Sequence, residues 1–226
     1  MASNKKTVDI TIQCITYNGN TQVGSETTCL IVANAKESAC VPTVSTSITD
    51  TNSYSTSLTG NNVTIIKGFN TMSVALSATA KNGATISSYK TTCGDKKLTS
   101  ASGTMSNVES NVFDIVVVDS RGFRTEMTET HPTINYTKPT ISFSASAVLN
   151  DDKINISLNV SGKYFNGSFG ATSNSMTLQY RYKASDSSTW AGWYTLTPTF
   201  NGANYSWVGT LLNFNYKNSY TLQCRV

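Results

Sequence analysis

The residues best suited to binding chemistry are aromatic, and they gather in the last part of the chain. All three tryptophans lie there, with several tyrosines close to them in sequence. Exposed aromatic rings stack on the apolar faces of sugars, and nearby amide and hydroxyl groups orient the ligand. The same rings also serve as core residues or as protein–protein contacts. These three interpretations stay open, and the candidate contact residues are Trp190, Trp193, Tyr194, Tyr205 and Trp207.

Catalytic constellations are missing from the sequence, so we expect no enzymatic activity. The single histidine, His131, precedes Pro132, and we expect it to be an exposed linker residue. No nucleophile elbow, zinc-protease motif or phosphate-binding glycine loop occurs. The acidic residues are thinly spread, and Asp151 and Asp152 are adjacent, which predicts a turn better than a pair of carboxylates on one sugar bond. We expect no catalytic, cofactor-binding or metal site, although a calcium site at this turn stays an alternative.

The five cysteines do not form a recognisable metal or disulfide pattern. Their number is odd, and none of them has C-x-x-C spacing. We therefore expect free thiols that act as small apolar residues of strands. Cys14 and Cys29 lie on the two arms of a predicted hairpin, and we expect both to be free thiols even if the hairpin brings them face to face.

Composition favours strands over helices and excludes several classes of partner. Charged residues make up 13% of the chain, about half the usual share, and Ser, Thr and Asn together exceed a third. Thr is β-branched, and all three types compete with helical hydrogen bonds. The net charge of +4 comes from scattered Lys and Arg, so we expect no nucleic-acid partner. No apolar run reaches the length of about 20 residues that a membrane helix needs, so we expect no membrane insertion.

An internal repeat divides the chain. The sequence Pro-Thr-Val-Ser at 42–45 returns as Pro-Thr-Ile-Ser at 139–142, a spacing of 97 residues. A period near 100 residues filled with short strands is typical of immunoglobulin-like sandwiches. Alternation in 112–118 places Phe113, Ile115 and Val117 on one face, and the turn at 119–122 predicts a hairpin with 123–128.

The pattern predicts an all-β protein of tandem immunoglobulin-like β-sandwiches, truncated at both ends. Residues 1–41 are expected to form the final hairpin of a partial unit, with Val8, Ile10 and Ile12 on one face. Residues 42–138 are expected to form a complete immunoglobulin-like domain. Residues 139–226 are expected to form an immunoglobulin-like or fibronectin-III-like domain without its last strand.

Three segments carry a resemblance to a known group of proteins: 16–29, 116–142 and 178–226. They resemble the tandem immunoglobulin-like and fibronectin-like repeats of siphophage minor structural proteins, which are tail-fibre or tail-tip proteins of phages that infect Gram-positive hosts. The resemblance implies a virion component that acts as a spacer or adhesion module in host attachment, made in the bacterial cytoplasm and extracellular after release. It implies other tail proteins or copies of the chain as partners, with bacterial cell-wall polysaccharide as a further candidate. It supplies no catalytic residues and no cofactors.

Two other functions remain open beside the tail protein. A bacterial surface adhesin can be built from similar modules. A cell-wall hydrolase can carry such a module as a carbohydrate-binding accessory domain.

Overall fold

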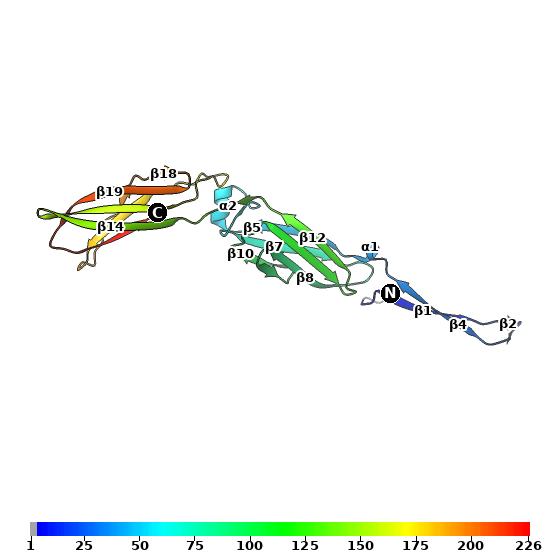
Figure 1. The fold of residues 1–226 in the computed structure, drawn as a ribbon. Helices are drawn as coiled ribbons and strands as arrows, with labels where there is room; N and C mark the ends of the chain where they lie inside the picture. The colour runs from blue at the N-terminus through cyan, green and yellow to red at the C-terminus, as the bar shows by residue number, and fades with distance from the viewer. Residues whose placement is uncertain (1–3) are drawn as a thin grey trace. The chain divides into compact units, whose positions relative to one another are not determined.

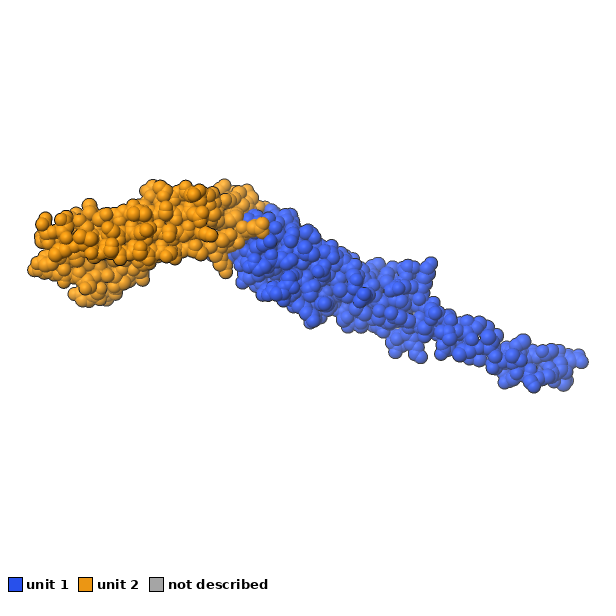
Figure 2. All heavy atoms as spheres, in the orientation of Figure 1, with its two compact units in different colours: residues 1–57, 61–134 blue, residues 58–60, 135–226 orange. Residues whose placement is uncertain are grey.

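The computed structural model describes residues 4–226 and confirms the all-β fold. It divides the chain into two compact units, coloured separately in Figure 2: unit 1 comprises 1–57 and 61–134, and unit 2 comprises 58–60 and 135–226. The division after residue 134 lies four residues before the boundary expected from the repeat, and residues 58–60 group with unit 2. The N-terminal hairpin groups with unit 1. None of the helices in residues 4–226 is long and apolar enough to cross a membrane.

Unit 1 begins with a two-stranded ribbon and continues as a sandwich of two antiparallel sheets (Figure 1). The ribbon consists of β1 (Thr7–Cys14) and β4 (Thr27–Asn34), with the short strands β2 (Tyr17–Asn18) and β3 (Thr21–Gln22) at its tip. The first sheet has the order β10-β7-β5 and the second the order β12-β11-β8-β9. Their bounds are β5 (Thr43–Asp50), β7 (Thr71–Thr79), β8 (Ile86–Cys93), β9 (Lys96–Leu98), β10 (Ser102–Ser106), β11 (Val112–Asp119) and β12 (Arg124–Thr130).

Two short helices and one short parallel pair complete unit 1 and its connections. The helices are α1 (Glu37–Cys40) and α2 (Ser53–Thr59), and the parallel strands are β6 (Ile65–Ile66) and β13 (Thr133–Ile134). The core of the sandwich receives side chains from both sheets. Phe113, Ile115 and Val117 of β11 are at most 1% exposed, as their alternation predicts.

The β11–β12 hairpin closes through the side chain of Asp119. Its Oδ1 accepts hydrogen bonds from the backbone N–H of Arg121 at 2.9 Å and of Phe123 at 2.8 Å. Gly122 has a φ of +80°, a conformation that suits glycine because it has no Cβ. The turn chemistry of Asp119–Gly122 therefore explains why the chain reverses here.

His131 is a correction to the expectation from sequence. The side chain is 5% exposed and lies against Phe113, with ring centroids 5.4 Å apart. Nδ1 lies 2.9 Å from the carbonyl oxygen of Val63, and Nε2 lies 3.0 Å from Oε1 of Glu129. The residue is a buried, hydrogen-bonded packing residue because segments distant in sequence meet around it, which neighbouring Pro132 does not reveal.

In the first ribbon both thiols are free, and they lie on the same face in diagonal positions. Cys14 pairs across the ribbon with Thr27, and Cys29 pairs with Ile12, so the two cysteines do not lie opposite each other. Side chains alternate along each strand, so Val8, Ile10 and Ile12 share a face with Ala33, Ile31 and Cys29. Ile10, Ile12 and Ile31 remain 43–49% exposed.

Unit 2 is a second sandwich of two antiparallel sheets. Four strands form the order β14-β15-β19-β18, and three strands form the order β17-β16-β20. Their bounds are β14 (Thr140–Asn150), β15 (Lys153–Lys163), β16 (Leu178–Ala184), β17 (Tyr194–Leu196), β18 (Thr199–Asn201), β19 (Asn204–Asn215) and β20 (Tyr220–Arg225). Its buried cluster contains residues of both sheets, among them Leu158, Leu178, Tyr205 and Phe214.

Candidate functional site

The aromatic candidates of unit 2 do not form one site, because they lie on different faces of the sandwich. Tyr205 is 2% exposed and belongs to the core, so it offers no ring face to a ligand. Trp207 is half-buried and packs against the same core. A Cβ on Gly209 would lie 2.5 Å from the Trp207 ring, so this glycine leaves room for the indole. No tryptophan in residues 4–226 is among the fully buried core residues.

Tyr194 packs at the edge of β17 against two tyrosines of β16. Its ring centroid lies 5.2 Å from that of Tyr180 and 5.9 Å from that of Tyr182, in stacked geometries. Burial raises the pKa of Tyr180, and the contact with Tyr194 raises the pKa of Tyr182, followed by burial. Tyr194 is 44% exposed. It therefore covers the edge of the core and keeps part of its ring in solvent.

Trp190 and Trp193 come together on the outer face of the three-stranded sheet. Leu178, Tyr180 and Tyr182 of β16 belong to or pack against the core, so the alternating residue Arg181 points outward. The Ala191 N–H donates to the Tyr182 carbonyl at 2.8 Å, which fixes the loop before β17 beside β16. Trp190 and Trp193 flank Ala191 in the sequence. The bond therefore places both indoles beside the outward-pointing side chains of β16.

Three cations lie over these two indole rings. The Arg181 guanidinium is 4.5 Å from the ring centroids of both Trp190 and Trp193. Lys183 Nζ is 5.3 Å from the centroid of Trp190, and the Arg225 guanidinium is 4.0 Å from that of Trp193. We call these five residues the cation–indole ladder. Each contact of this kind contributes about 0.5–1 kcal/mol at an exposed site.

Two glutamines hold the arginines of the ladder in place. Arg181 Nε donates to Gln223 Oε1 at 2.9 Å, and Arg225 Nε donates to Gln179 Oε1 at 2.8 Å. Each bond crosses from β16 to β20, whose pairing aligns Gln179 with Arg225 and Arg181 with Gln223. The sheet therefore fixes both guanidinium groups by one nitrogen each.

Arg181, Lys183 and Arg225 are functional candidates that the sequence interpretation missed. Their signal was the alternation Gln179, Arg181, Lys183 in one strand and Thr221, Gln223, Arg225 in another. The pairing of two strands so far apart in sequence was needed to join the two series.

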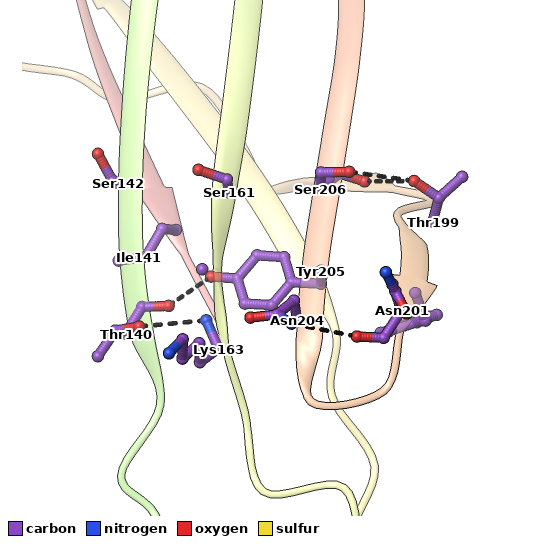
Figure 3. A pocket seen from close by; sticks show the side chains of 12 residues that line it. Thr140, Ile141, Ser142, Ser161, Lys163, Thr199, Asn201, Asn204, Tyr205 and Ser206 are labelled. Carbon is purple, nitrogen blue, oxygen red and sulfur yellow. Dashed lines mark hydrogen bonds between the residues drawn. The ribbon is translucent and has the colours of Figure 1, made fainter.

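An open groove at one end of the other sheet is the second candidate site (Figure 3). It has a volume of about 720 Å³, and its lining is made mostly of hydroxyl and amide side chains. Strand pairing arranges these side chains in two rows across β14, β15, β19 and β18. The first row is Ser142, Ser161, Ser206 and Thr199, and the second is Thr140, Lys163, Asn204 and Asn201.

Hydrogen bonds within the groove fix its walls. Thr199 Oγ1 donates to the Ser206 carbonyl at 3.1 Å, and the Lys163 N–H donates to Thr140 Oγ1 at 3.1 Å. The Tyr205 hydroxyl donates to the Thr140 carbonyl at 2.8 Å, so the ring lies across β15 as Figure 3 shows. Burial raises the pKa of Tyr205. Ser142, Ser161 and Ser206 stay exposed, and the Ser206 hydroxyl shares a hydrogen bond with Thr199 Oγ1 at 3.2 Å.

Among residues 4–226, no group of three or more His, Cys, Asp or Glu side chains is placed to hold a metal ion. Asp151 and Asp152 form the turn between β14 and β15, and Asp151 has a φ of +54°.

Comparison with known proteins adds one finding. The chain matches the family model described as "Siphovirus protein of unknown function (DUF859)" over residues 2–221. No curated protein and no solved structure matches the chain significantly. The family match covers nearly the whole chain and includes both sandwich units. The chain therefore belongs to this family of siphovirus proteins of unknown function.

Proposed function

We propose that this chain is a structural component of the siphophage tail, in a tail fibre or at the tail tip, where it acts as a spacer and adhesion module in host attachment. The observation that carries the proposal is the repetition of a sandwich with its own core within a siphovirus protein. Each unit buries its own apolar residues. Units of this kind can therefore follow one another along a chain, because none of them needs a core shared with its neighbour. The function is mechanical and involves no catalysis. Other tail proteins or further copies of the chain are its assembly partners.

The polar surface supports a role in contact with solvent and cell surfaces. Exposed Ser, Thr and Asn side chains keep the sandwich surfaces hydrated with few charges. Hydroxyl and amide groups exchange hydrogen bonds with sugar hydroxyls as readily as with water. The chain is therefore suited to lie close to a polysaccharide without strong nonspecific binding.

Antibody interference tests the role in attachment. Antibodies raised against the purified chain should slow adsorption of the phage that encodes it, because they cover a component used during attachment. Antibodies depleted on the immobilised chain are the control and should leave the adsorption rate unchanged. An antibody that saturates the chain and leaves adsorption unchanged contradicts a role in attachment.

Saccharide binding is a second candidate function, and the groove between Thr140 and Thr199 favours it. Its two rows consist of hydroxyl and amide groups together with Lys163, and they match a sugar chain better than an apolar ligand. Replacing Ser161 and Ser206 by Val should abolish binding of wall saccharide, measured by calorimetry. The same replacement at Ser144 and Ser146, which lie farther along β14, is the control. Equal loss in both variants contradicts a site in the groove.

A further inference from the structure

The net charge of the chain lies entirely in its C-terminal part. Residues 1–134 contain ten basic and ten acidic residues, whereas residues 135–226 contain seven basic and three acidic residues. The formal charge of +4 therefore belongs to unit 2. Three of the seven basic residues stand together in the cation–indole ladder.

The ladder cations lack acidic partners within the described chain. In residues 4–226 the salt bridges join Lys96 with Asp95, Arg124 with Glu126, and His131 with Glu129. None of these pairs includes a ladder residue. The polar contacts that hold Arg181 and Arg225 are to neutral glutamine oxygens. Their positive charge is therefore left to be balanced by solvent ions or by a ligand.

The three cations form a row along the sheet. Lys183 and Arg181 are alternate residues of β16, and Arg225 on β20 pairs with Gln179, the next alternate position of β16. Alternate residues of a strand are about 6.6–6.8 Å apart. The strand positions of the three cations therefore follow one another at a regular repeat on the outer face. A polymer with regularly repeated anionic groups matches such a row, whereas a single small anion uses only one position.

Guanidinium chemistry favours phosphate as the anionic group. Arg presents a planar fork of N–H donors that binds phosphate oxygens in pairs. In both arginines the Nε atom is bound to a glutamine, so the terminal nitrogens are the donors left for a ligand. The half-buried indoles hold the forks over their rings.

The indole rings argue against nucleic acid as the source of the phosphates. Single-stranded nucleic acids bind with their bases stacked on exposed aromatic rings. Two cations lie over Trp190 and two over Trp193, which occupies the surfaces that a base needs. We propose that the cation–indole ladder binds a phosphodiester-linked polyol or sugar polymer through Lys183, Arg181 and Arg225. The identification of this polymer as part of a host cell surface rests on the function proposed above. The binding of the polymer to the ladder does not depend on that function.

Binding to a defined polyanion tests the ladder. Fluorescently labelled poly(glycerol phosphate) is titrated with the full chain at low salt and followed by anisotropy. We expect saturable binding whose affinity falls with salt, with a logarithmic slope of about −2 for three phosphate contacts. The double variant Arg181→Gln, Arg225→Gln should bind at least about tenfold more weakly, with a slope near about −0.7. Neutral dextran should not bind at the ladder.

Matched variants separate the ladder from net charge and from misfolding. Lys138→Gln with Lys153→Gln removes the same charge from unit 2 outside the ladder and should retain nearly all of the affinity. Lys183→Gln removes an end cation that anchors no neighbour by a hydrogen bond, so it should fold normally and bind more weakly than the unchanged chain. Circular dichroism and thermal melting verify the fold of each variant.

Three results would overturn the inference. They are undetectable binding to poly(glycerol phosphate), equal weakening in the ladder and control variants, and equally tight binding of oligothymidylate with the same number of phosphates. If ladder binding fails while antibodies against the chain still slow adsorption, the ladder inference is wrong and the attachment function stands. If polymer binding succeeds and the antibodies have no effect, the attachment function fails alone.

Discussion

At the residue scale, indole rings and guanidinium groups stabilise the outer face of the three-stranded sheet by contact with one another. Trp193 is half-buried, with Arg181 and Arg225 over its ring at 4.5 and 4.0 Å. A fully buried core tryptophan would contribute more, because its removal leaves a cavity. The position of Trp193 in the ladder therefore predicts a moderate loss of stability when its side chain is truncated. A core tryptophan would show a larger loss.

Replacing Trp193 by Ala should lower the free energy of unfolding by about 2 kcal/mol, from two cation–π contacts and partial burial. Chemical denaturation of the full chain, followed by the unfolding of unit 2, measures the change. Val208→Thr is a control on a strand position that is 75% exposed and should change stability by at most about 0.5 kcal/mol. A loss of about 4 kcal/mol or more in Trp193→Ala would place the ring in the core.

Tyr205 of β19 reaches across β15 to β14 through one hydrogen bond, which predicts a pH effect. Burial raises its pKa above the ordinary value of 10.0. Below pH 10 the hydroxyl is protonated in both folded and unfolded chains, so its contribution is complete. As the pH rises through the folded pKa, the unfolded chain ionises first and that stability is lost.

Tyr205→Phe should therefore lower the free energy of unfolding by about 1 kcal/mol near neutral pH, because it removes the hydrogen bond to the Thr140 carbonyl. Above pH 10 the difference between the two proteins should shrink, since the variant has no hydroxyl to ionise. Urea denaturation at a series of pH values measures both effects. A difference that grows with pH would show that the hydroxyl is not buried in the folded chain.

At the element scale, a glycine lets Tyr205 cross β15. Gly162 pairs with Tyr205, and a Cβ on this glycine would overlap the Thr140 carbonyl oxygen and lie 2.5 Å from the Tyr205 hydroxyl. β15 is the central strand between β14 and β19, so a shift there disturbs both neighbours. The Tyr205 ring therefore packs directly on the backbone of β15, and this contact shapes the groove.

Gly162→Ala should therefore destabilise unit 2 by about 3 kcal/mol or more, because the added methyl group forces backbone or ring to move. Ser161→Ala is the matched control, since its exposed side chain points to the other face of β15. Thermal unfolding of both variants is the measurement. Equal stability of the two variants would contradict the crossing of Tyr205 over Gly162.

We expect the stability of the β1–β4 ribbon to depend on a partner. A two-stranded ribbon is marginal in water, and the face with Ile10, Ile12 and Ile31 stays exposed. We expect copies of the chain to associate through this face. Ile31→Asp should abolish association in light scattering, whereas Thr11→Asp on the opposite face should preserve it. A monomer at every concentration, with 7–34 protected from hydrogen exchange like β11, would contradict association.

Local patterns in the sequence predicted local elements well and missed contacts between distant segments. Alternation in 112–118 and the turn at Asp119–Gly122 depend on neighbours, and the structure has the hairpin there. His131 was misplaced because its contact with Val63 joins residues 68 apart in the chain. The ladder was missed because Arg181 and Arg225 meet only through the pairing of β16 with β20. The sequence left Tyr205 open between a core residue and a surface contact, because its place in the core depends on contacts with other strands.

At the scale of the whole molecule, two sandwiches with separate cores suit a protein that presents surfaces rather than one that encloses a reaction. We therefore expect no release of sugar or peptide when the purified chain is incubated with bacterial cell walls. The measurement is a reducing-sugar and free-amine assay against a known wall hydrolase. Activity that disappears when one acidic residue is replaced would contradict the structural role.

Immunogold electron microscopy of purified virions tests most directly whether the chain is part of the phage tail. Antibodies against the chain should place gold at the tail fibre or tail tip, and serum depleted on the immobilised chain should place none. Gold confined to the capsid, or unlabelled virions in a lysate that contains the chain, would contradict the account.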